Sequence, residues 1–241
     1  MASSSLPPGE VTPGAEWLDA MHLASPSLPV GGFAYSQGLE QAHASGLVSD
    51  KASAQVWIGD VLLLILARQE LPAWLACFRH TRRQDWQSVM ALTDDLAALR
   101  ETAELRLESR QMAYSMIRLY AQWLPEGFPE AIKPSEQVKA KLATNYTMAH
   151  AVLCGLRLTD ERIGLTAFVW SWLENQVLAA IKTVPLGQLD GQALLHELKP
   201  SVTQAMTIAQ ETPLDLAASA PIGLAMISSQ HETQYSRLFR S

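Results

Sequence analysis

The chain has 241 residues, of which 48% are hydrophobic and 17% are charged, and its formal net charge at pH 7 is −6. This length fits one large domain or two small ones, and the negative charge without a Lys/Arg run argues against a nucleic-acid footprint. A composition with so many hydrophobic and so few charged residues suggests that a partner covers part of the molecular surface.

The N-terminal segment and the cysteines indicate the compartment. Residues 1–14 are rich in Ser, Pro and Gly and have no apolar core, so they predict a disordered leader rather than a signal peptide. Cys77 and Cys154 lie far apart without a CxxC motif, which favours reduced, buried thiols. The most apolar run, 61–67, is too short to span a bilayer. We therefore expect a cytoplasmic protein.

The first third of the chain predicts helices around one irregular loop. A short helix is expected over 16–24, and Ser36 is predicted to cap a helix over 37–44. A long helix starts at Ser49 and passes the apolar run with no polar face, which is typical of a central helix. It is expected to run through about Gln69, or to continue past Pro72 to Arg79 with a kink.

Further helices follow over 85–92, 94–123, 135–158, 159–184, 192–210 and 222–228, with a Pro/Gly loop over 124–134. The helix over 94–123 carries mixed-sign charges, Arg100, Glu104 and Glu108 among them, and this pattern predicts a solvated face. The helix that starts at Thr159 is the clearest, and Pro185 ends it.

No stretch alternates with period two, and no unit of about 20–50 residues repeats. The sequence thus predicts an all-α, single-domain bundle of roughly eight to ten helices without significant sheet. Its parts are the disordered leader over 1–14, the helical domain over 15–229 and a C-terminal tail over 230–241.

Motifs for catalysis are missing from the sequence. There is no phosphate-binding loop, dinucleotide fingerprint or nucleophile elbow, and His231-Glu232 lacks the second histidine of a zincin. His150 and Cys154 share one helix face at i,i+4, but two ligands do not make a metal site. A binding module is therefore favoured over an enzyme. The rival is a small-molecule-binding protein or enzyme with a pocket lined by Trp57, Trp74, Trp170 and Trp172.

The loop over 24–40 reads A-S-P-S-L-P-V-G-G-F-A-Y-S-Q-G-L-E. Pro26 and Pro29 fix the backbone, whereas Gly31 and Gly32 permit conformations that a Cβ forbids. Such a loop is either a structural corner plugged by aromatics or a functional surface with a fixed shape.

Two later stretches complete the pattern. Residues 181–188, I-K-T-V-P-L-G-Q, form a break between two helices, and by themselves they predict a turn. Residues 231–241, H-E-T-Q-Y-S-R-L-F-R-S, combine two aromatics with two arginines, which are the residue types that dominate interface energy. This tail either packs back on its own domain or folds onto a partner.

These three stretches, in this order, resemble the UreF family of urease accessory proteins. The resemblance runs from about Trp17 to the C-terminus. It implies a non-enzymatic helical scaffold that docks on UreD, also called UreH, and recruits the GTPase UreG for nickel insertion into apo-urease. It also implies a homodimer and an influence on GTP hydrolysis, and it implies no cofactor, resident metal, nucleic acid or membrane.

The resemblance assigns partner binding to residues of all three stretches: Pro29, Gly31, Gly32, Tyr35, Ser36, Gly38, Glu40, Gly187, Gln188, Tyr235, Arg237, Leu238, Phe239 and Arg240. Pro29 and the glycines are expected to shape the backbone, whereas Tyr35, Glu40 and the tail are expected to contact partners. The chain departs from the family pattern in Phe33-Ala34 and in its leader. A weaker idea is direct nickel carriage by the scattered histidines.

Overall fold

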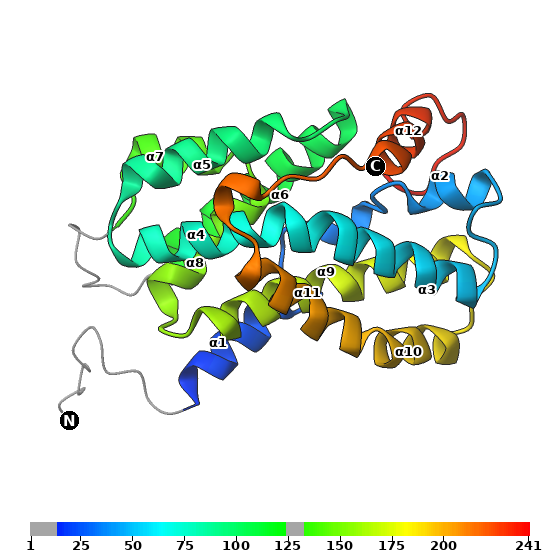
Figure 1. The fold of residues 1–241 in the computed structure, drawn as a ribbon, viewed down its shortest axis with the longest axis horizontal. Helices are drawn as coiled ribbons and strands as arrows, with labels where there is room; N and C mark the ends of the chain where they lie inside the picture. The colour runs from blue at the N-terminus through cyan, green and yellow to red at the C-terminus, as the bar shows by residue number, and fades with distance from the viewer. Residues whose placement is uncertain (1–13, 124–132) are drawn as a thin grey trace.

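A computed structural model of the chain describes residues 14–123 and 133–241, and the described residues form helices and no strand (Figure 1). The α-helices are α1 (Ala15–Ala24), α2 (Leu39–Ala44), α3 (Lys51–Asp60), α4 (Glu70–Arg82), α5 (Trp86–Ala98), α6 (Ala103–Trp123), α7 (Glu136–Leu142), α8 (Tyr146–Arg157), α9 (Glu161–Thr183), α10 (Gln188–Glu197), α11 (Lys199–Glu211) and α12 (Ile222–His231). The all-α prediction is confirmed, with slightly more helices than expected. The predicted leader over 1–13 and most of the loop over 124–134 lie outside the described residues.

The core lies where α4, α8 and α9 meet. Trp74 on α4 is fully buried and stacks on Phe78, with ring centroids 5.5 Å apart. Two glycines let the neighbouring helices approach: a Cβ on Gly155 of α8 would lie 2.9 Å from Thr81, and one on Gly164 of α9 would lie 2.9 Å from Trp74. The helices are therefore held together by close packing that leaves no room for a larger side chain at these positions.

The long helix predicted over 49–79 is real but interrupted. Between α3 and α4 the chain forms a π-helical turn, η2 (Val61–Ile65), and a 3₁₀ turn, η3 (Leu66–Arg68), and the axis bends by 42° there. The kink predicted at Pro72 is wrong, because Pro72 lies in the first turn of α4, where a backbone N–H has no partner in the helix. Among the described helices, no single one is long and apolar enough to cross a membrane.

Several helix boundaries differ from the prediction, and at two of them a side chain caps a helix where the periodicity continues. The helix predicted over 135–158 is two helices, since Asn145 accepts a hydrogen bond from Met148 N at 3.2 Å and starts α8. Asp160, not Thr159, caps α9. The boundary predicted between 92 and 94 lies later, because α5 continues to Ala98 and α6 starts at Ala103. The helix predicted over 192–210 is two helices, α10 and α11, and α10 starts earlier, at Gln188.

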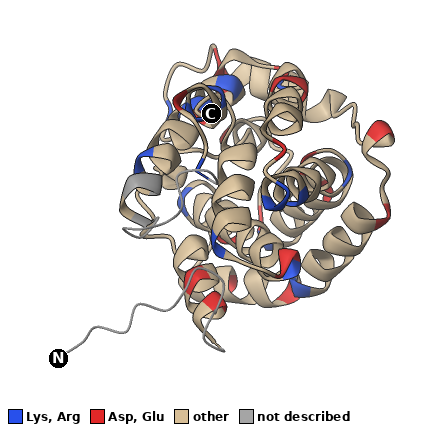
Figure 2. Ribbon diagram, turned by 90° about the vertical axis from the view of Figure 1, so that its left-hand side faces the viewer, with Lys and Arg blue, Asp and Glu red and all other residues tan. Residues whose placement is uncertain are grey.

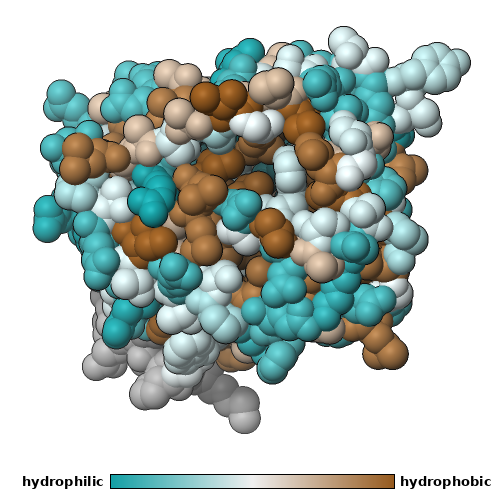
Figure 3. All heavy atoms as spheres, turned by 45° about the vertical axis from the view of Figure 1, so that its right-hand side comes forward, coloured by the Kyte–Doolittle hydropathy of each residue, from teal (hydrophilic) through white to brown (hydrophobic). Residues whose placement is uncertain are grey.

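The molecular surface has interspersed charges and an apolar region. Figure 2 shows acidic and basic residues mixed among neutral ones. Exposed large hydrophobic side chains gather on α3, on η2, on η5 (Leu214–Leu216) and on α12: they are Val56, Leu64, Leu214, Leu216, Ile222 and Met226. Figure 3 shows hydrophobic residues in the middle of one face with hydrophilic residues around them. This exposed apolar surface agrees with the high fraction of hydrophobic residues in the sequence.

Candidate partner-binding site

The loop before α2 has its shape fixed by three left-handed residues, Gly31, Gln37 and Gly38. Gly31 has φ of +80° and begins a 3₁₀ turn, η1 (Gly32–Ala34), and Gly38 has φ of +84° just before α2. A Cβ on Gly38 would also lie 3.1 Å from Leu224 of α12. The N-cap is Gly38 and not the predicted Ser36, because α2 begins at Leu39. The Ser36 hydroxyl oxygen still accepts a hydrogen bond from the backbone N–H of Glu40 at 3.3 Å, and Ser36 also contacts the tail.

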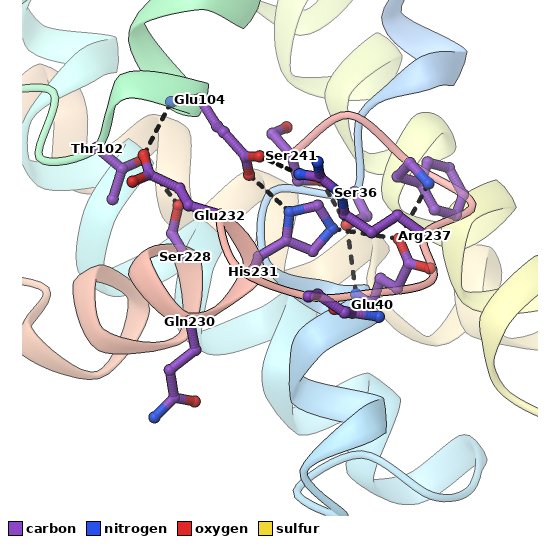
Figure 4. A network of polar contacts seen from close by, with 12 residues as sticks. Ser36, Glu40, Thr102, Glu104, Ser228, Gln230, His231, Glu232, Arg237 and Ser241 are labelled. Carbon is purple, nitrogen blue, oxygen red and sulfur yellow. Dashed lines mark hydrogen bonds and ion pairs between the residues drawn. The ribbon is translucent and has the colours of Figure 1, made fainter.

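Glu40, on the first turn of α2, holds the backbone of the tail. Its carboxylate accepts hydrogen bonds from the backbone N–H of Leu238 at 2.6 Å and of Phe239 at 2.9 Å. It also lies 3.2 Å from Nε2 of His231 at the end of α12 (Figure 4). The buried Glu40 side chain therefore anchors the backbone of the tail through hydrogen bonds.

His231 is fully buried and faces a carboxylate on each ring nitrogen. Nδ1 lies 2.6 Å from Oε2 of Glu104 on α6, opposite the contact with Glu40. The imidazole therefore bridges the two carboxyl groups. Arg237 contacts the other oxygen of Glu104. These contacts link α2, α12, α6 and the tail.

The last residues of the tail pack into the groove beside α6. Ser36 donates from its backbone N–H at 2.8 Å and from its hydroxyl at 2.6 Å to the main-chain oxygen of Ser241. The Ser241 hydroxyl donates to Glu108 at 2.6 Å, and Gln37 donates to the other oxygen of Glu108, also at 2.6 Å. Burial raises the pKa of the Glu108 carboxyl, while these two donors oppose the rise. Both ends of the tail are therefore anchored.

Contacts of two aromatic side chains complete this arrangement. The Phe239 ring is buried, with Nζ of Lys182 5.5 Å from its centroid. The Tyr35 hydroxyl donates to Gln111 on α6, which Arg240 also reaches at 3.4 Å. Burial raises the pKa of Tyr35, which therefore remains a neutral donor.

We call the polar side chains that hold the tail, together with the tail itself, the tail network: Ser36, Gln37, Glu40, Glu104, Glu108, His231 and residues 232–241. The tail network fixes the backbone of the tail but leaves some side chains of the tail exposed. The Tyr235 side chain is as exposed as in an extended chain, and Leu238 is 72% exposed although its own N–H is bound.

The comparisons with known proteins agree on one family. A family model described as UreF matches residues 48–199. The chain belongs to the UreF family of urease accessory proteins. It is similar to the urease accessory protein UreF of Cupriavidus pinatubonensis, with 44% identity across 96% of this chain and 100% of that protein. It is also similar to the proteins of that name from Cupriavidus necator, with 45% identity over 93% and 97%, and Bordetella bronchiseptica, with 46% over 92% and 100%.

The structure packs the loop stretch against the tail, and the stretch over 181–188 reaches the tail through Lys182, which lies over the Phe239 ring. Tyr35, Ser36 and Glu40 from the loop and α2 contact the tail or α6 beside it. Pro29, Gly31 and Gly32 belong to the same loop and form no hydrogen bond with the tail among the described residues. Gly187 and Gln188 lie exposed at the corner between α9 and α10, outside the tail network. Partner contact by these residues stays a prediction.

Sequence reasoning missed the acidic half of the tail network in this UreF-family chain. Glu104 and Glu108 were expected on a solvated face, but Glu108 is buried and the Glu104 side chain is only 15% exposed. Arg100, expected on the same face, is also largely covered and bonds Glu70. His231 was considered only as half of a failed zinc motif. No local signal pairs these residues, since 127 positions separate Glu104 from His231.

Two other candidate sites have ordinary structural explanations. His150 and Cys154 are both fully buried on α8, and Nδ1 of His150 accepts a hydrogen bond from the Trp74 indole at 3.2 Å. Within the described parts of the chain, no group of three or more His, Cys, Asp or Glu side chains is placed to hold a metal ion. The predicted tryptophan pocket is not found: Trp172 lines a cavity beside the loop before α2, whereas Trp57 and Trp170 do not line it and Trp74 is fully buried in the core.

Proposed function

We propose that this chain is a non-enzymatic scaffold for assembly of the urease nickel site. In this proposal it docks on UreD, also called UreH, and recruits the GTPase UreG, so that nickel reaches apo-urease. A homodimer and an influence on GTP hydrolysis by UreG are further parts of the proposal. Membership of the UreF family supports the general role, since the similar proteins are named urease accessory proteins.

The anchored but exposed tail is the observation that carries the docking part. Glu40 binds the N–H groups of Leu238 and Phe239, so the backbone of this segment is ordered before any partner arrives. The side chains of Tyr235 and Leu238 are nevertheless exposed to solvent. A large, rigid aromatic and an aliphatic side chain on a pre-ordered backbone bind with little further loss of entropy.

Neighbouring surface supports the same conclusion. Phe33, in the loop that meets the tail, is 62% exposed although Tyr35 beside it is buried. Arg237 and Arg240 flank the exposed Leu238. The result is an apolar surface with a cationic rim, a composition typical of protein interfaces. The two cysteines are free and buried, which is compatible with the cytoplasm as the proposed compartment.

The test mixes the chain with UreD and then with UreG and measures complex mass by size-exclusion chromatography with light scattering. A double variant, Tyr235→Ala with Leu238→Ala, removes only exposed groups. Leu18→Ala is a matched control, because Leu18 on α1 is 69% exposed and lies outside the residues predicted to bind partners. We expect the wild type and the control to form a complex, and the double variant to weaken it by roughly ten-fold or more. Failure of the wild type to bind either partner, where an authentic accessory set assembles, contradicts the proposal.

A chain truncated after Ser229 extends this test, since it lacks the whole tail. It also loses His231 from the core, so its folding must be checked by circular dichroism before its binding is compared. A folded truncation that still binds UreD as tightly as the wild type would show that the tail is not the docking element.

A further inference from the structure

A separate cavity lies between the loop before α2 and helices α6, α8 and α9. Its volume is about 80 Å³. Its apolar lining comes from the loop and the three helices: Pro26, Leu28, Val30, Phe33, Met112, Tyr146, Phe168, Trp172 and Leu178. Gln37 and Glu108 line this cavity and also belong to the tail network, so the two features share a wall.

Three carboxylates and one guanidinium line the cavity, which leaves it with excess negative charge. Glu70 is satisfied, because it accepts from Arg100 at 3.0 Å and from Thr147 at 2.7 Å. Glu108 is satisfied by Gln37 and the tail. Glu174 is different: nothing in the chain forms a hydrogen bond or ion pair with it among the described residues.

Glu174 lies on the face of α9 that lines the cavity, together with Ser171, Asn175 and Leu178 at helical spacing. Burial raises the pKa of its carboxyl, and no neighbouring donor opposes that rise. An incoming cation therefore gains both a charge partner and an acceptor whose hydrogen bonds are not already used. Neighbours on the same face are committed, since Asn175 donates to Tyr35 O and Trp172 donates to Gln37.

The size of the cavity restricts what enters. A water molecule takes about 30 Å³ in the liquid, and pockets for whole small-molecule ligands are about 300 Å³ or more. A cavity of about 80 Å³ fits a head group of a few atoms. The occupant is therefore the end of a longer chain that stays outside, as a side chain does.

A planar, delocalised cation fits these walls best. Aromatic rings attract cations over their faces, and guanidinium groups stack on them more readily than ammonium groups. The cavity supplies four aromatic residues, Phe33, Tyr146, Phe168 and Trp172, and Phe33 at 62% exposure marks its open side. A guanidinium also matches a carboxylate through two parallel hydrogen bonds.

We propose that this cavity takes the guanidinium group of an arginine from a bound protein, with Glu174 as the acceptor and the aromatic residues as walls. The site lies next to the tail network, so it would act as an anchor within the docking surface of the proposed function, on which the identity of the bound protein rests. Binding of the guanidinium group itself does not depend on that function.

The experiment uses the full-length chain and two probes of equal shape. N-acetylarginine amide carries the guanidinium, and N-acetylcitrulline amide replaces it by a neutral urea group. Two-dimensional NMR follows the indole N–H of Trp172 and the side-chain amide of Asn175, both of which line the cavity. We expect saturable shifts with the arginine probe, none with the citrulline probe, and none at the indole of exposed Trp17 in either case.

A pair of variants identifies the acceptor. Glu174→Gln keeps the size and removes the charge, and we expect it to weaken binding of the arginine probe by roughly ten-fold. Asp215→Asn, on the exposed turn η5, is the matched control and should bind like the wild type. Equal shifts with both probes, no shifts up to the solubility limit, or unchanged affinity in Glu174→Gln would each overturn the inference.

These outcomes separate the inference from the proposed function. If the probe does not bind but Tyr235→Ala with Leu238→Ala weakens the complex with UreD, the cavity is not an anchor and the scaffold proposal stands. If the probe binds but no complex forms with UreD or UreG, the guanidinium site stands and its partner is a different protein.

Discussion

Two fully buried histidines in this protein have opposite electrostatic surroundings. His150 lies in the core among Trp74, Phe168 and Tyr146, and burial lowers its pKa to about 3. His231 lies in the tail network with a carboxylate on each ring nitrogen. Aromatic rings surround the first imidazole, whereas the second bridges two carboxyl groups. Two histidines that are equally buried therefore have different partners.

This difference also separates how the two regions are held together. The core depends on shape, since Gly155 and Gly164 admit no Cβ without displacing α4 side chains. The tail network depends on charge, because Glu40 and Glu104 face each other across one imidazole. Removing a charged or polar partner should therefore destabilise the tail network far more than the core. Lowering the pH should change the contributions of the two regions to the free energy of unfolding in opposite directions.

Replacing His231 should have the largest effect. His231→Leu has a similar volume but leaves Glu40 and Glu104 without their common hydrogen-bonding partner. We expect a loss of about 3–5 kcal/mol in the free energy of unfolding, as measured by urea denaturation. The control is His196→Leu, because His196 is exposed. A loss below about 1 kcal/mol would mean that the bridge between the two carboxyl groups does not stabilise the folded chain.

The neutral histidine should make the core sensitive to acid. Its pKa in the folded chain, about 3, is below its ordinary value of 6.5, so the unfolded chain binds the extra proton between these values. Stability conferred by neutral His150 is thus present above pH 6.5 and is lost as pH falls. From pH 7 to pH 5 this amounts to about 2 kcal/mol.

The variant that checks this is His150→Gln, which keeps an acceptor for the Trp74 indole but does not titrate. Denaturation at a series of pH values should show a decrease about 2 kcal/mol smaller than in the wild type. The same pH dependence in both proteins would show that His150 is not the group responsible.

Glu108 should give the smallest effect, with the opposite sign. Burial raises its pKa above the ordinary 4.5, so above that value the folded chain binds the proton more tightly than the unfolded chain. Its contribution therefore favours folding more as pH falls through this window and less as pH rises. Glu108→Gln should remove this term, measured as the change in unfolding free energy between pH 7 and pH 5. Glu211→Gln, at an exposed position on α11, is the control, and a change of the same size there would contradict the assignment.

Much of the fold could be predicted because its causes are local. The apolar spacing from Ile163 to Val184 predicts α9, and Pro185 correctly marks its end. Errors arise where one side chain outcompetes the periodic pattern, as Asn145 does between α7 and α8. The bend before α4 was placed at Pro72 because the π-helical turn over Val61–Ile65 has only apolar residues and no breaker.

The candidate site was predictable only in part. The loop and the tail were singled out by composition, and the structure places them against each other. Glu104 and Glu108 were interpreted as a solvated face, because charges at helical spacing give the same pattern whether water or another segment faces them. The cavity beside Glu174 has no counterpart in the sequence, since its walls come from the loop before α2, from α4, α6, α8 and α9, and from Arg100.

The sequence by itself determines the all-α class, the central apolar helices, the family and the two stretches that meet at the tail. These follow from local periodicity, from glycine and proline chemistry, and from motif order. Only the tertiary structure decides that His231 bridges two carboxyl groups while His150 has a lowered pKa in the core, and that Glu40 holds the tail rather than facing solvent. The reason is physical: the charge and exposure of a side chain depend on the partners that folding places beside it, here across 198 positions between Glu40 and Leu238.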